Sequence, residues 1–205
     1  MKLDILLIGG CNWIARELID KLLENKDPFT LTIIDNLSSP ISSRQFSSMY
    51  AYLDEVCYVY GDIKMISIDT YIHPDTIVIY NIWCEPDSVL GLYKLVNTCK
   101  IKPYSKLIYT VNPSLKQQFI SITSVLPSTI GITCDGELIG NYGIDNIRDP
   151  IDTIQYYKDI GNNVFMNKKF HYYDMTSAVN FIYFWFFIDS KEIHTHINQP
   201  LKEYI

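Results

Sequence analysis

The stretch that decides the fold runs from Leu3 to Asp35 and reads LDILLIGGCNWIARELIDKLLENKDPFTLTIID. Its first six residues are mostly apolar and stop at two glycines, which predicts a strand buried on both faces. Residues 13–24 place apolar side chains at helical spacing with charged ones between them, and Asp27-Pro28 ends that helix. Residues 31–34 form a second apolar run. The stretch therefore predicts a strand–helix–strand unit in a parallel sheet.

The rest of the chain continues this alternation. Further strands are expected at 56–60, 76–82, 106–111 and 119–123, and helices from Ser88 to about Cys99 and from Asp174 to about Phe187. We therefore predict an α/β fold with a Rossmann-like, doubly wound, mostly parallel sheet and a reduced C-terminal part. A single domain is expected over 1–205, with a nucleotide-binding core at 1–118 and one remaining sheet strand plus a reduced segment at 119–205.

The composition is that of a globular protein and argues against two kinds of partner. The chain has 205 residues, of which 48% are hydrophobic, and a net charge of −6. A sequence-independent nucleic-acid binder needs a basic face, so no nucleic-acid partner is expected. The apolar run 181–188 is far shorter than the ~20 residues that cross a bilayer, so no membrane span is expected.

The cysteines and the amino-acid composition indicate the compartment in which the protein is expected. The five cysteines are widely spaced and form no C-x-x-C pair, which argues against a disulfide framework and a zinc site. We therefore expect the cytoplasm or another reducing compartment. Ile, Tyr, Asn, Asp and Ser are abundant while alanine is rare, a bias typical of an AT-rich genome such as that of a large DNA virus. For a viral protein, the compartment would be the host cytoplasm or the virion.

Three segments occur in the order found in a known enzyme family. One strand ends in IGGCNWIA at 8–15, the next ends in IDNLSS at 34–39, and the third is followed by Gly61-Asp62-Ile63. This series resembles the NAD-dependent epimerase/dehydratase family, the extended short-chain dehydrogenases that act on nucleotide sugars. The corresponding motifs of that family read TGGxGFIG, DNLS and GDI or GDL.

The likeness extends along nearly the whole chain. The segment VLGLYKLV at 89–96 resembles the NVxGTxNLL helix of the family, and LIYT at 107–110 resembles its FVYTSS strand. Near the C-terminus, FHYYD at 170–174 resembles the RDFVYVDD segment. Each motif is weak alone, and their common order and spacing are what make the resemblance specific.

The resemblance implies an NAD site at the ends of the first three strands. Its residues would be Gly9, Gly10, Asn12, Trp13, Ile14, Asp35, Asn36, Asp62 and Ile63. The two glycines would bring backbone N–H groups to the pyrophosphate, and Asp35 would bind the adenosine ribose and disfavour NADP. Asp62 and Ile63 would border the adenine. A purely structural role stays open, with a tight turn at the glycines and loop carboxylates at the two aspartates.

Two departures from the family concern the cofactor groove. Asn12 stands where the family has the glycine that lets the cofactor approach, so its side chain is expected to crowd the pyrophosphate. The family's fourth strand ends in H-L-A-A, whereas the matching residues here are Tyr80-Asn81-Ile82-Trp83. Either Ile82 and Trp83 fill the groove as new core or the end of the strand has moved.

A third departure concerns catalysis. The family uses a Ser or Thr after the fifth strand and a Tyr-x-x-x-Lys helix, in which the Tyr acts as acid and base. Residues 112–118 hold no such pattern, so that helix is expected to be deleted, and with it half of the helix bundle through which the family dimerises. The one Tyr-x-x-x-Lys, Tyr60 to Lys64, straddles a strand end and is interpreted as coincidence. Any dimer is therefore expected to use another surface.

The remaining chemistry-bearing residues form no recognisable site. His194 and His196 would share a face of a strand, but no carboxylate or cysteine pattern completes a metal site. We therefore expect no metal. Tyr109 and Tyr142 are the candidates for a relocated acid and base, and Thr110 and Ser114 are the hydroxyls nearest to the family's serine position.

Three functions follow from these observations. The first is a catalytically inactive protein of the family, a pseudoenzyme kept for a structural or protein-interaction role. The second is a regulatory module that binds NAD(H) through Gly9, Gly10 and Asp35 without turnover. The third is an active NAD-dependent oxidoreductase or epimerase with relocated acid and base residues. The sequence favours the first, because fold alone does not provide activity.

Overall fold

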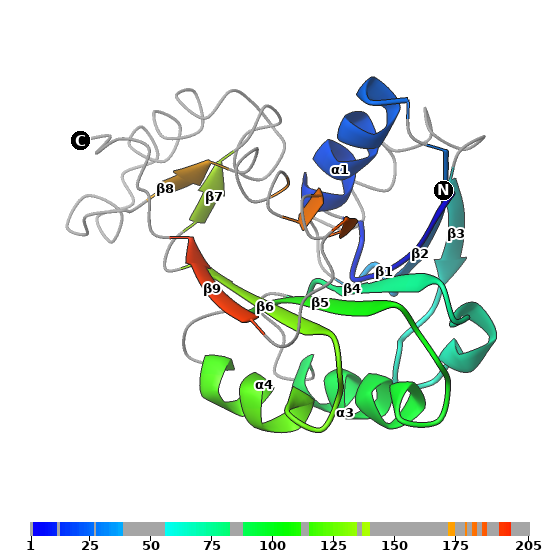
Figure 1. Ribbon diagram of the computed structural model, residues 1–205, viewed down its shortest axis with the longest axis vertical. Helices are drawn as coiled ribbons and strands as arrows, with labels where there is room; N and C mark the ends of the chain where they lie inside the picture. Colours follow the sequence, from blue (N-terminus) through cyan, green and yellow to red (C-terminus); the bar gives the residue numbers. More distant parts are fainter. Residues whose placement is uncertain are drawn as a thin grey trace.

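A seven-stranded, entirely parallel sheet forms the centre of the molecule, shown in the computed structural model of Figure 1. The structure describes residues 2–11, 13–26, 28–38, 56–82, 88–111, 115–134, 137–139, 172–174, 179, 182–183, 186–187 and 193–197. The strands of the sheet are β1 (Leu3–Ile8), β2 (Phe29–Asp35), β3 (Val56–Tyr60), β4 (Thr76–Tyr80), β5 (Lys106–Val111), β6 (Thr129–Cys134) and β9 (Ile193–Ile197). A separate parallel pair is formed by β7 (Glu137–Ile139) and β8 (Tyr172–Asp174).

The helices cover both faces of the sheet. They are α1 (Trp13–Glu24), the 3-10 turn η2 (Ile68–Tyr71), α3 (Ser88–Cys99) and α4 (Lys116–Thr123). Figure 1 shows α1 on one face, and α3 and α4 on the opposite face. The strand order is β3-β2-β1-β4-β5-β6-β9, so the winding reverses between β1 and β4. This arrangement confirms the predicted Rossmann-like, doubly wound fold.

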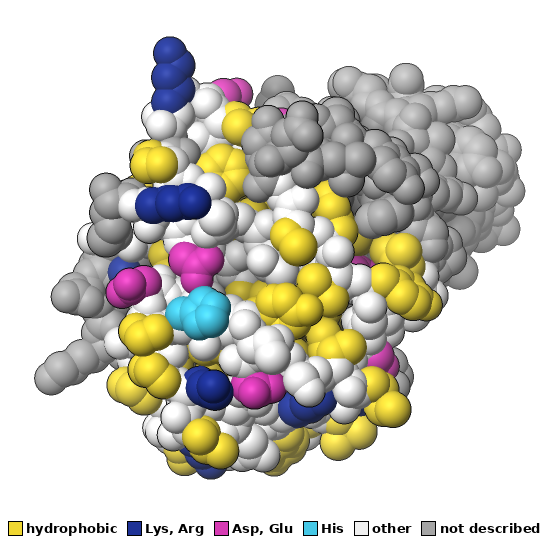
Figure 2. All heavy atoms as spheres, turned by 90° about the vertical axis from the view of Figure 1, so that its right-hand side faces the viewer, with side chains coloured by type: hydrophobic (Ala, Val, Ile, Leu, Met, Phe, Trp, Pro, Cys, Tyr) yellow, Lys and Arg dark blue, Asp and Glu magenta, His cyan; other side chains and the backbone are white. Residues whose placement is uncertain are grey.

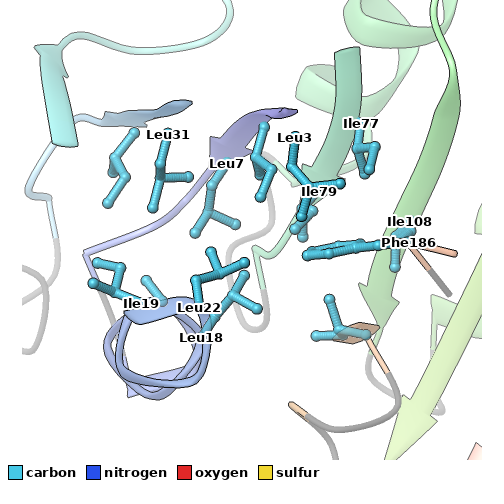
Figure 3. Packing of buried hydrophobic residues seen from close by; sticks show 14 of the residues in the cluster. Leu3, Leu7, Leu18, Ile19, Leu22, Leu31, Ile77, Ile79, Ile108 and Phe186 are labelled. Carbon is cyan, nitrogen blue, oxygen red and sulfur yellow. The ribbon is translucent and has the colours of Figure 1, made fainter. Parts of the chain in front are cut away.

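Two apolar cores flank the sheet because its central strands are buried on both faces. The core under α1 contains Leu18, Ile19 and Leu22 of the helix against alternate residues of β1, β2 and β4, as Figure 3 shows. The opposite core lies beneath α3 and α4. Asp4, a carboxylate in the mainly apolar β1, ties three strands together. It accepts hydrogen bonds from the hydroxyls of Thr30, at 2.9 Å, and Thr76, at 2.5 Å.

Residues near the C-terminus complete the core under α1. Val179, Ile182 and Phe186 are buried there, and the Phe186 ring lies beside Ile79 and Ile108 (Figure 3). The backbone is helical at 179, 182–183 and 186, in line with the helix expected from Asp174 to Phe187. Lys106, which is 7% exposed, donates from Nζ to the carbonyl oxygen of Phe186 at 3.1 Å. This buried charge therefore attaches the C-terminal segment to β5.

Most predicted elements are confirmed, and some lie outside the described residues. The strands expected at 56–60 and 106–111 and the helix at 13–24 have the predicted bounds. The strand at 76–82 ends earlier, at Tyr80. None of the helices that the structure describes has the length and apolar character needed to cross a membrane. On the face shown in Figure 2, Lys and Arg side chains lie scattered among acidic and apolar ones.

The strand expected at 119–123 is wrong, because these residues belong to helix α4. Phe119, Ile122 and Thr123 are its buried residues, and their spacing of three and four is that of one helical face. The sixth strand is instead β6, which pairs parallel to β5. A parallel crossover needs a dozen or more residues, and the segment from 112 to 128 that contains α4 provides them. The expected deletion of a helix between these strands is therefore also wrong.

An aromatic cluster attaches α4 to the sheet. The ring centroid of Phe119 lies 6.2 Å from that of Tyr80 on β4 and 5.5 Å from that of Tyr109 on β5, and all three side chains are fully buried. The Tyr80 hydroxyl donates to the carbonyl oxygen of Ser88 at the start of α3. A Cβ on Gly91 would lie 2.6 Å from that hydroxyl, so α3 can lie this close only because residue 91 is a glycine.

Phe119→Ala is expected to lower the free energy of unfolding by about 3–5 kcal/mol, because it leaves a cavity between α4 and two strands. Chemical denaturation measures this change. The matched control is Gln118→Ala on the exposed side of the same helix, for which a change within about 0.5 kcal/mol is expected. A loss of less than about 1 kcal/mol for the Phe119 variant would show that the cluster does not stabilise the fold.

Candidate functional site

The candidate site lies at the carboxyl ends of the strands, where the order reverses between β1 and β4. In doubly wound sheets, ligands bind at this position. The turn after β1 begins at Gly9, whose N–H donates to the carbonyl oxygen of Ile34 on β2 at 2.8 Å. On the other side, the N–H of Asn81 donates to the carbonyl oxygen of Ile8 at 2.9 Å. These bonds hold the ends of the three central strands together.

Both glycines of the turn are required by the packing of the protein itself. Gly9 has a φ of 72°, and a Cβ there would lie 2.7 Å from the carbonyl oxygen of Asn81 and 2.8 Å from Cγ1 of Ile82. A Cβ on Gly10 would lie 2.7 Å from Cγ2 of Ile33 and 2.9 Å from Cγ of Leu7. The glycines therefore allow close approach of strand ends and core side chains, whatever else the turn binds.

Asp35 ends β2 beside this turn, and backbone donors orient its carboxylate. Oδ2 accepts a hydrogen bond from the N–H of Cys11 at 2.9 Å, and Oδ1 accepts one from the N–H of Leu37 at 2.8 Å. Leu37 has a φ of 52°, which is unusual for leucine and stores strain beside the site. Asn36 is half-buried, and its Oδ1 accepts from the N–H of Ser38 at 3.1 Å. The carboxylate is thus held in place and half-exposed.

Asp62 and Ile63 follow β3 and help to build the next turn. Oδ1 of Asp62 accepts from the N–H of Lys64 at 2.8 Å, and Oδ2 lies 3.4 Å from Nζ of Lys64. Ile63 is buried in the core beneath α3. Lys94 of α3 fixes this turn by donating to the carbonyl oxygens of Lys64, at 2.9 Å, and Ile66, at 2.6 Å. Within the described residues, Asp62 makes contacts typical of a loop residue, and Ile63 makes contacts typical of a core residue.

Three further predicted residues lie at the start of α1. Trp13 and Ile14 are its first two residues, so their backbone N–H groups belong to the helix turn that has no intrahelical acceptor. The side chains of both lie outside the described residues, as does Asn12. The crowding expected from Asn12 therefore stays a prediction.

The ends of β4 and β5 are closed by their own side chains. The register of β1 with β4 continues to the pair Ile8 and Tyr80. Ile82 is half-buried and packs against the core beneath α3. Asn81, 2% exposed, accepts on Oδ1 a hydrogen bond of 2.5 Å from the hydroxyl of Thr110, which is 1% exposed. Ile82 therefore fills space at the strand end, while Trp83 lies outside the described residues.

Solved structures with the same topology include a dTDP-glucose 4,6-dehydratase from Bacillus anthracis in complex with NAD, which matches with a TM-score of 0.68 and 15% identity. This match covers 96% of the present chain and 76% of the dehydratase. The chain has the fold of the NAD-dependent epimerases and dehydratases. A UDP-glucuronic acid 4-epimerase from Bacillus cereus in complex with NAD matches with a TM-score of 0.66 and 12% identity, over 94% and 78% of the two chains.

The epimerase/dehydratase fold is supported by a third structure, and by structure alone. A UDP-N-acetylglucosamine 4-epimerase from Bacillus cereus matches with a TM-score of 0.66 and 11% identity, over 98% of this chain and 81% of that one. No protein-family model and no curated protein matches the sequence. The similarity therefore lies in the fold. Any chemical activity has to be inferred from the residues of the site.

The resemblance noted in the sequence implies a Tyr-x-x-x-Lys helix after the fifth strand, and the helix that follows β5 here is α4. Its sequence, KQQFISIT, contains no tyrosine, and its buried residues are Phe119, Ile122 and Thr123. Tyr60 and Lys64 stand at the end of β3 and in the following turn, away from this helix. Tyr109 is fully buried and cannot reach a substrate, and Tyr142 lies outside the described residues. Ser114 is likewise outside them.

No group of three or more His, Cys, Asp or Glu side chains capable of holding a metal occurs among the described residues. The backbone of His194 and His196 lies in β9, as the sequence predicted, but their side chains are outside the described set.

Sequence reasoning missed two features of this edge. Tyr60 is 78% exposed and is the register partner of Asp35, so an aromatic ring stands beside the carboxylate. The signal was present, because Tyr60 is the last residue of a predicted strand. The bond between Asn81 and Thr110 had no signal, because it joins two strand ends that are far apart in the sequence.

Cys11 leads to a prediction for alkaline pH. Burial, and then the charge of Asp35, raise the pKa of the Cys11 thiol to about 12. The unfolded chain therefore loses this proton first, and stability falls as pH rises above about 9, by up to ~1.4 kcal/mol per pH unit for one thiol. Cys11→Ala should make this fall shallower by about one proton, as measured by denaturation between pH 8 and 10.5.

The control for this prediction is Cys57→Ala on the edge strand β3, where the side chain is exposed. Its pH dependence should match that of the unchanged protein. Burial also raises the pKa of Cys99 to about 12, so part of the alkaline loss should remain in the Cys11 variant. Equal slopes for the Cys11 variant and the unchanged protein would contradict the prediction.

Proposed function

We propose that this protein is a pseudoenzyme that uses the epimerase/dehydratase fold as a scaffold without the redox and proton-transfer chemistry of that family. The observation that carries the proposal is α4. The helix between β5 and β6 presents Phe119 to the protein interior and has no tyrosine to act as acid and base. Proton transfer in catalysis needs a titratable group within hydrogen-bond reach of the reacting atom, and the one titratable side chain of this helix is Lys116, at its first position and without a tyrosine beside it.

The ends of β4 and β5 also support the proposal. Thr110, the nearest hydroxyl to the family's serine position, is 1% exposed and donates to Asn81. A hydroxyl that is covered and already donating is poorly placed to polarise a substrate. Tyr109, the relocated acid and base considered from the sequence, is fully buried against Phe119. An active oxidoreductase or epimerase with relocated residues is therefore the least supported alternative.

A structural or protein-interaction role is favoured by the helices on one face. In a chain with 23 acidic residues, α3 and α4 contain no Asp or Glu. Leu90 and Tyr93 on α3 are 58% and 50% exposed, and Ile101 just beyond it is 82% exposed. Exposed apolar side chains without interspersed acidic groups are typical of contact surfaces. A protein partner is therefore part of the proposal, while a nucleic-acid partner is not.

A regulatory module that binds NAD(H) without turnover is the second candidate. The carboxylate of Asp35 favours it, because this group is held beside the first turn and stays half-exposed. In this candidate function, ribose hydroxyls would donate to the same carboxylate that accepts from the N–H groups of Cys11 and Leu37. NAD is accordingly the candidate cofactor, and we propose no metal.

The proposal predicts no turnover of nucleotide sugars. The purified protein, supplied with NAD+ and dTDP-glucose, UDP-glucuronic acid or UDP-N-acetylglucosamine, should leave each sugar unchanged by NMR. It should also form no NADH by absorbance beyond a heat-denatured sample. Thr110→Val is the control variant, because it removes the hydroxyl at the family's serine position and nearly preserves side-chain shape. Turnover that disappears in this variant would refute the proposal, whereas a contaminating enzyme would be unaffected by the substitution.

A further inference from the structure

Charge is distributed unevenly along this chain. Residues 88–134 contain five lysines and neither Asp nor Glu, which gives this stretch a net charge of +5. The rest of the chain contains the other 12 basic residues and all 23 acidic ones, a net charge of −11. Because β5 is buried along its whole length, the stretch meets solvent mainly at α3, at α4 and at the turns beside them.

A line of exposed, mainly apolar residues runs along α3 and the turn that follows it. Leu90, Tyr93 and Ile101 are each at least half exposed, and Asn97 between them is exposed. Their spacing of three and four residues is that of one helical face. The chain keeps its helical course up to Ile101, whose N–H donates to the carbonyl oxygen of Thr98 at 3.0 Å. At 1.5 Å per residue, the line is about 16 Å long, or about three helical turns.

Two exposed lysines flank the end of this line. Lys100 and Lys102 stand on either side of Ile101, and both are exposed. In the part of the chain that the structure describes, neither pairs with a carboxylate, and the ion pair found there joins Lys64 to Asp62. Cations beside exposed apolar side chains favour a partner that supplies both carboxylates and apolar groups.

Helix α4 extends this surface. It lies beside α3 on the side of the sheet opposite α1 (Figure 1). Its exposed residues are polar and uncharged, namely Gln117, Gln118 and Ser121. We call the exposed residues of α3, of its following turn and of α4 the α3–α4 surface. This surface has an apolar line, a polar border and cations, and neither helix contributes an acidic residue.

Two other occupants fit this surface less well. A twofold contact between copies of the chain places the same patch against itself, so lysines would meet lysines with no Asp or Glu on either helix. Like charges across an interface oppose such a contact. Nucleic acid is held by many basic groups on phosphates, whereas residues 88–134 contain no arginine and the chain has a net charge of −6.

We propose that the α3–α4 surface binds a short, acidic, amphipathic helix of another protein. The apolar side chains of that helix pack on Leu90, Tyr93 and Ile101, and its carboxylates accept hydrogen bonds from Lys100 and Lys102. Apolar and aromatic anchors beside polar groups are typical of binding sites for proteins. The inference rests on the proposed protein-interaction role and adds the chemistry of the partner.

Fluorescence anisotropy of the full chain with a labelled synthetic peptide tests the inference. The probe is an end-blocked helical peptide of about 15 residues, about 22 Å long, with leucine at every third or fourth position and glutamate between. In the control peptide, lysine replaces each glutamate. The acidic peptide is expected to bind, and the control to bind at least about tenfold more weakly, since like charges then face each other. Added salt should weaken the acidic peptide.

Two results with these peptides would overturn the inference. The first is no binding of the acidic peptide at millimolar concentration. The second is equal affinity for the acidic peptide and its lysine counterpart, which would show that charge has no part in the choice of partner.

Three variants locate the site. Tyr93→Ala should weaken the acidic peptide about fivefold or more, as truncation of a central interface tyrosine does. Lys100→Glu should weaken it about tenfold and strengthen the lysine peptide. The matched control is Lys26→Glu just after α1, on the other side of the sheet, which makes the same charge change and should leave both affinities unchanged. An equal loss for the Lys26 variant would assign the effect to net charge and overturn the inference. All three residues are exposed, so the unfolding transition should stay the same.

The competing occupants give results of their own. Dimerisation in sedimentation that Tyr93→Ala abolishes would assign the α3–α4 surface to a second copy. Binding of a uridine oligonucleotide that Lys100→Glu abolishes would assign it to nucleic acid, and either result would overturn the inference. Failure of the acidic peptide to bind leaves the proposed absence of catalysis intact. Turnover of a nucleotide sugar would refute the pseudoenzyme, whatever the affinity for the peptide.

Discussion

The close approach between the turn after β1 and the end of β4 is the constraint on which the rest of the molecule depends. Gly9 adopts a φ of 72° and leaves no room for a Cβ, because the carbonyl oxygen of Asn81 and the side chain of Ile82 lie against its Cα. A side chain there would separate the two central strands where the winding reverses. The start of α1, the contact of Cys11 with Asp35, and the register of β1 with β4 all follow from this approach. Because Gly9 has no side chain, the two halves of the sheet can meet at this position.

The two halves of the sheet differ at their carboxyl ends. The first half ends in the partly exposed carboxylate of Asp35, whereas Asn81 and Thr110 in the second half are buried and hydrogen-bonded to each other. The aromatic cluster of Tyr80, Tyr109 and Phe119 shows the same tendency beneath the sheet, since all three are fully buried. Fold and chemistry depend on different residues, so a chain can keep the first without the second.

The sequence correctly predicted the elements whose spacing of apolar residues fits either a strand or a helix but not both. Residues 3–8 and 106–111 are short, mostly apolar runs, and 13–24 has a clear helical face, so their bounds agree with the structure. Residues 119–123 fit a strand by alternation and a helix by the spacing of Phe119, Ile122 and Thr123. The helix forms because Phe119 packs against Tyr80 and Tyr109, which are distant from it in the sequence. At the site, the glycines and Asp35 were found from motifs, whereas the closed strand ends depend on contacts that no local pattern encodes.

The contact of Phe186 with the core under α1 also bears on how the chain folds during synthesis. Leu7, Ile79 and Ile108 belong to this core, which Val179, Ile182 and Phe186 complete. Until residue 179 has been synthesised, part of this apolar surface is exposed to solvent. At about 5–20 residues per second, that interval lasts roughly 10–35 seconds for the strands made first. The nascent protein is thus exposed to aggregation late in translation, and the hydrogen bond from Lys106 to Phe186 can form only after that interval ends.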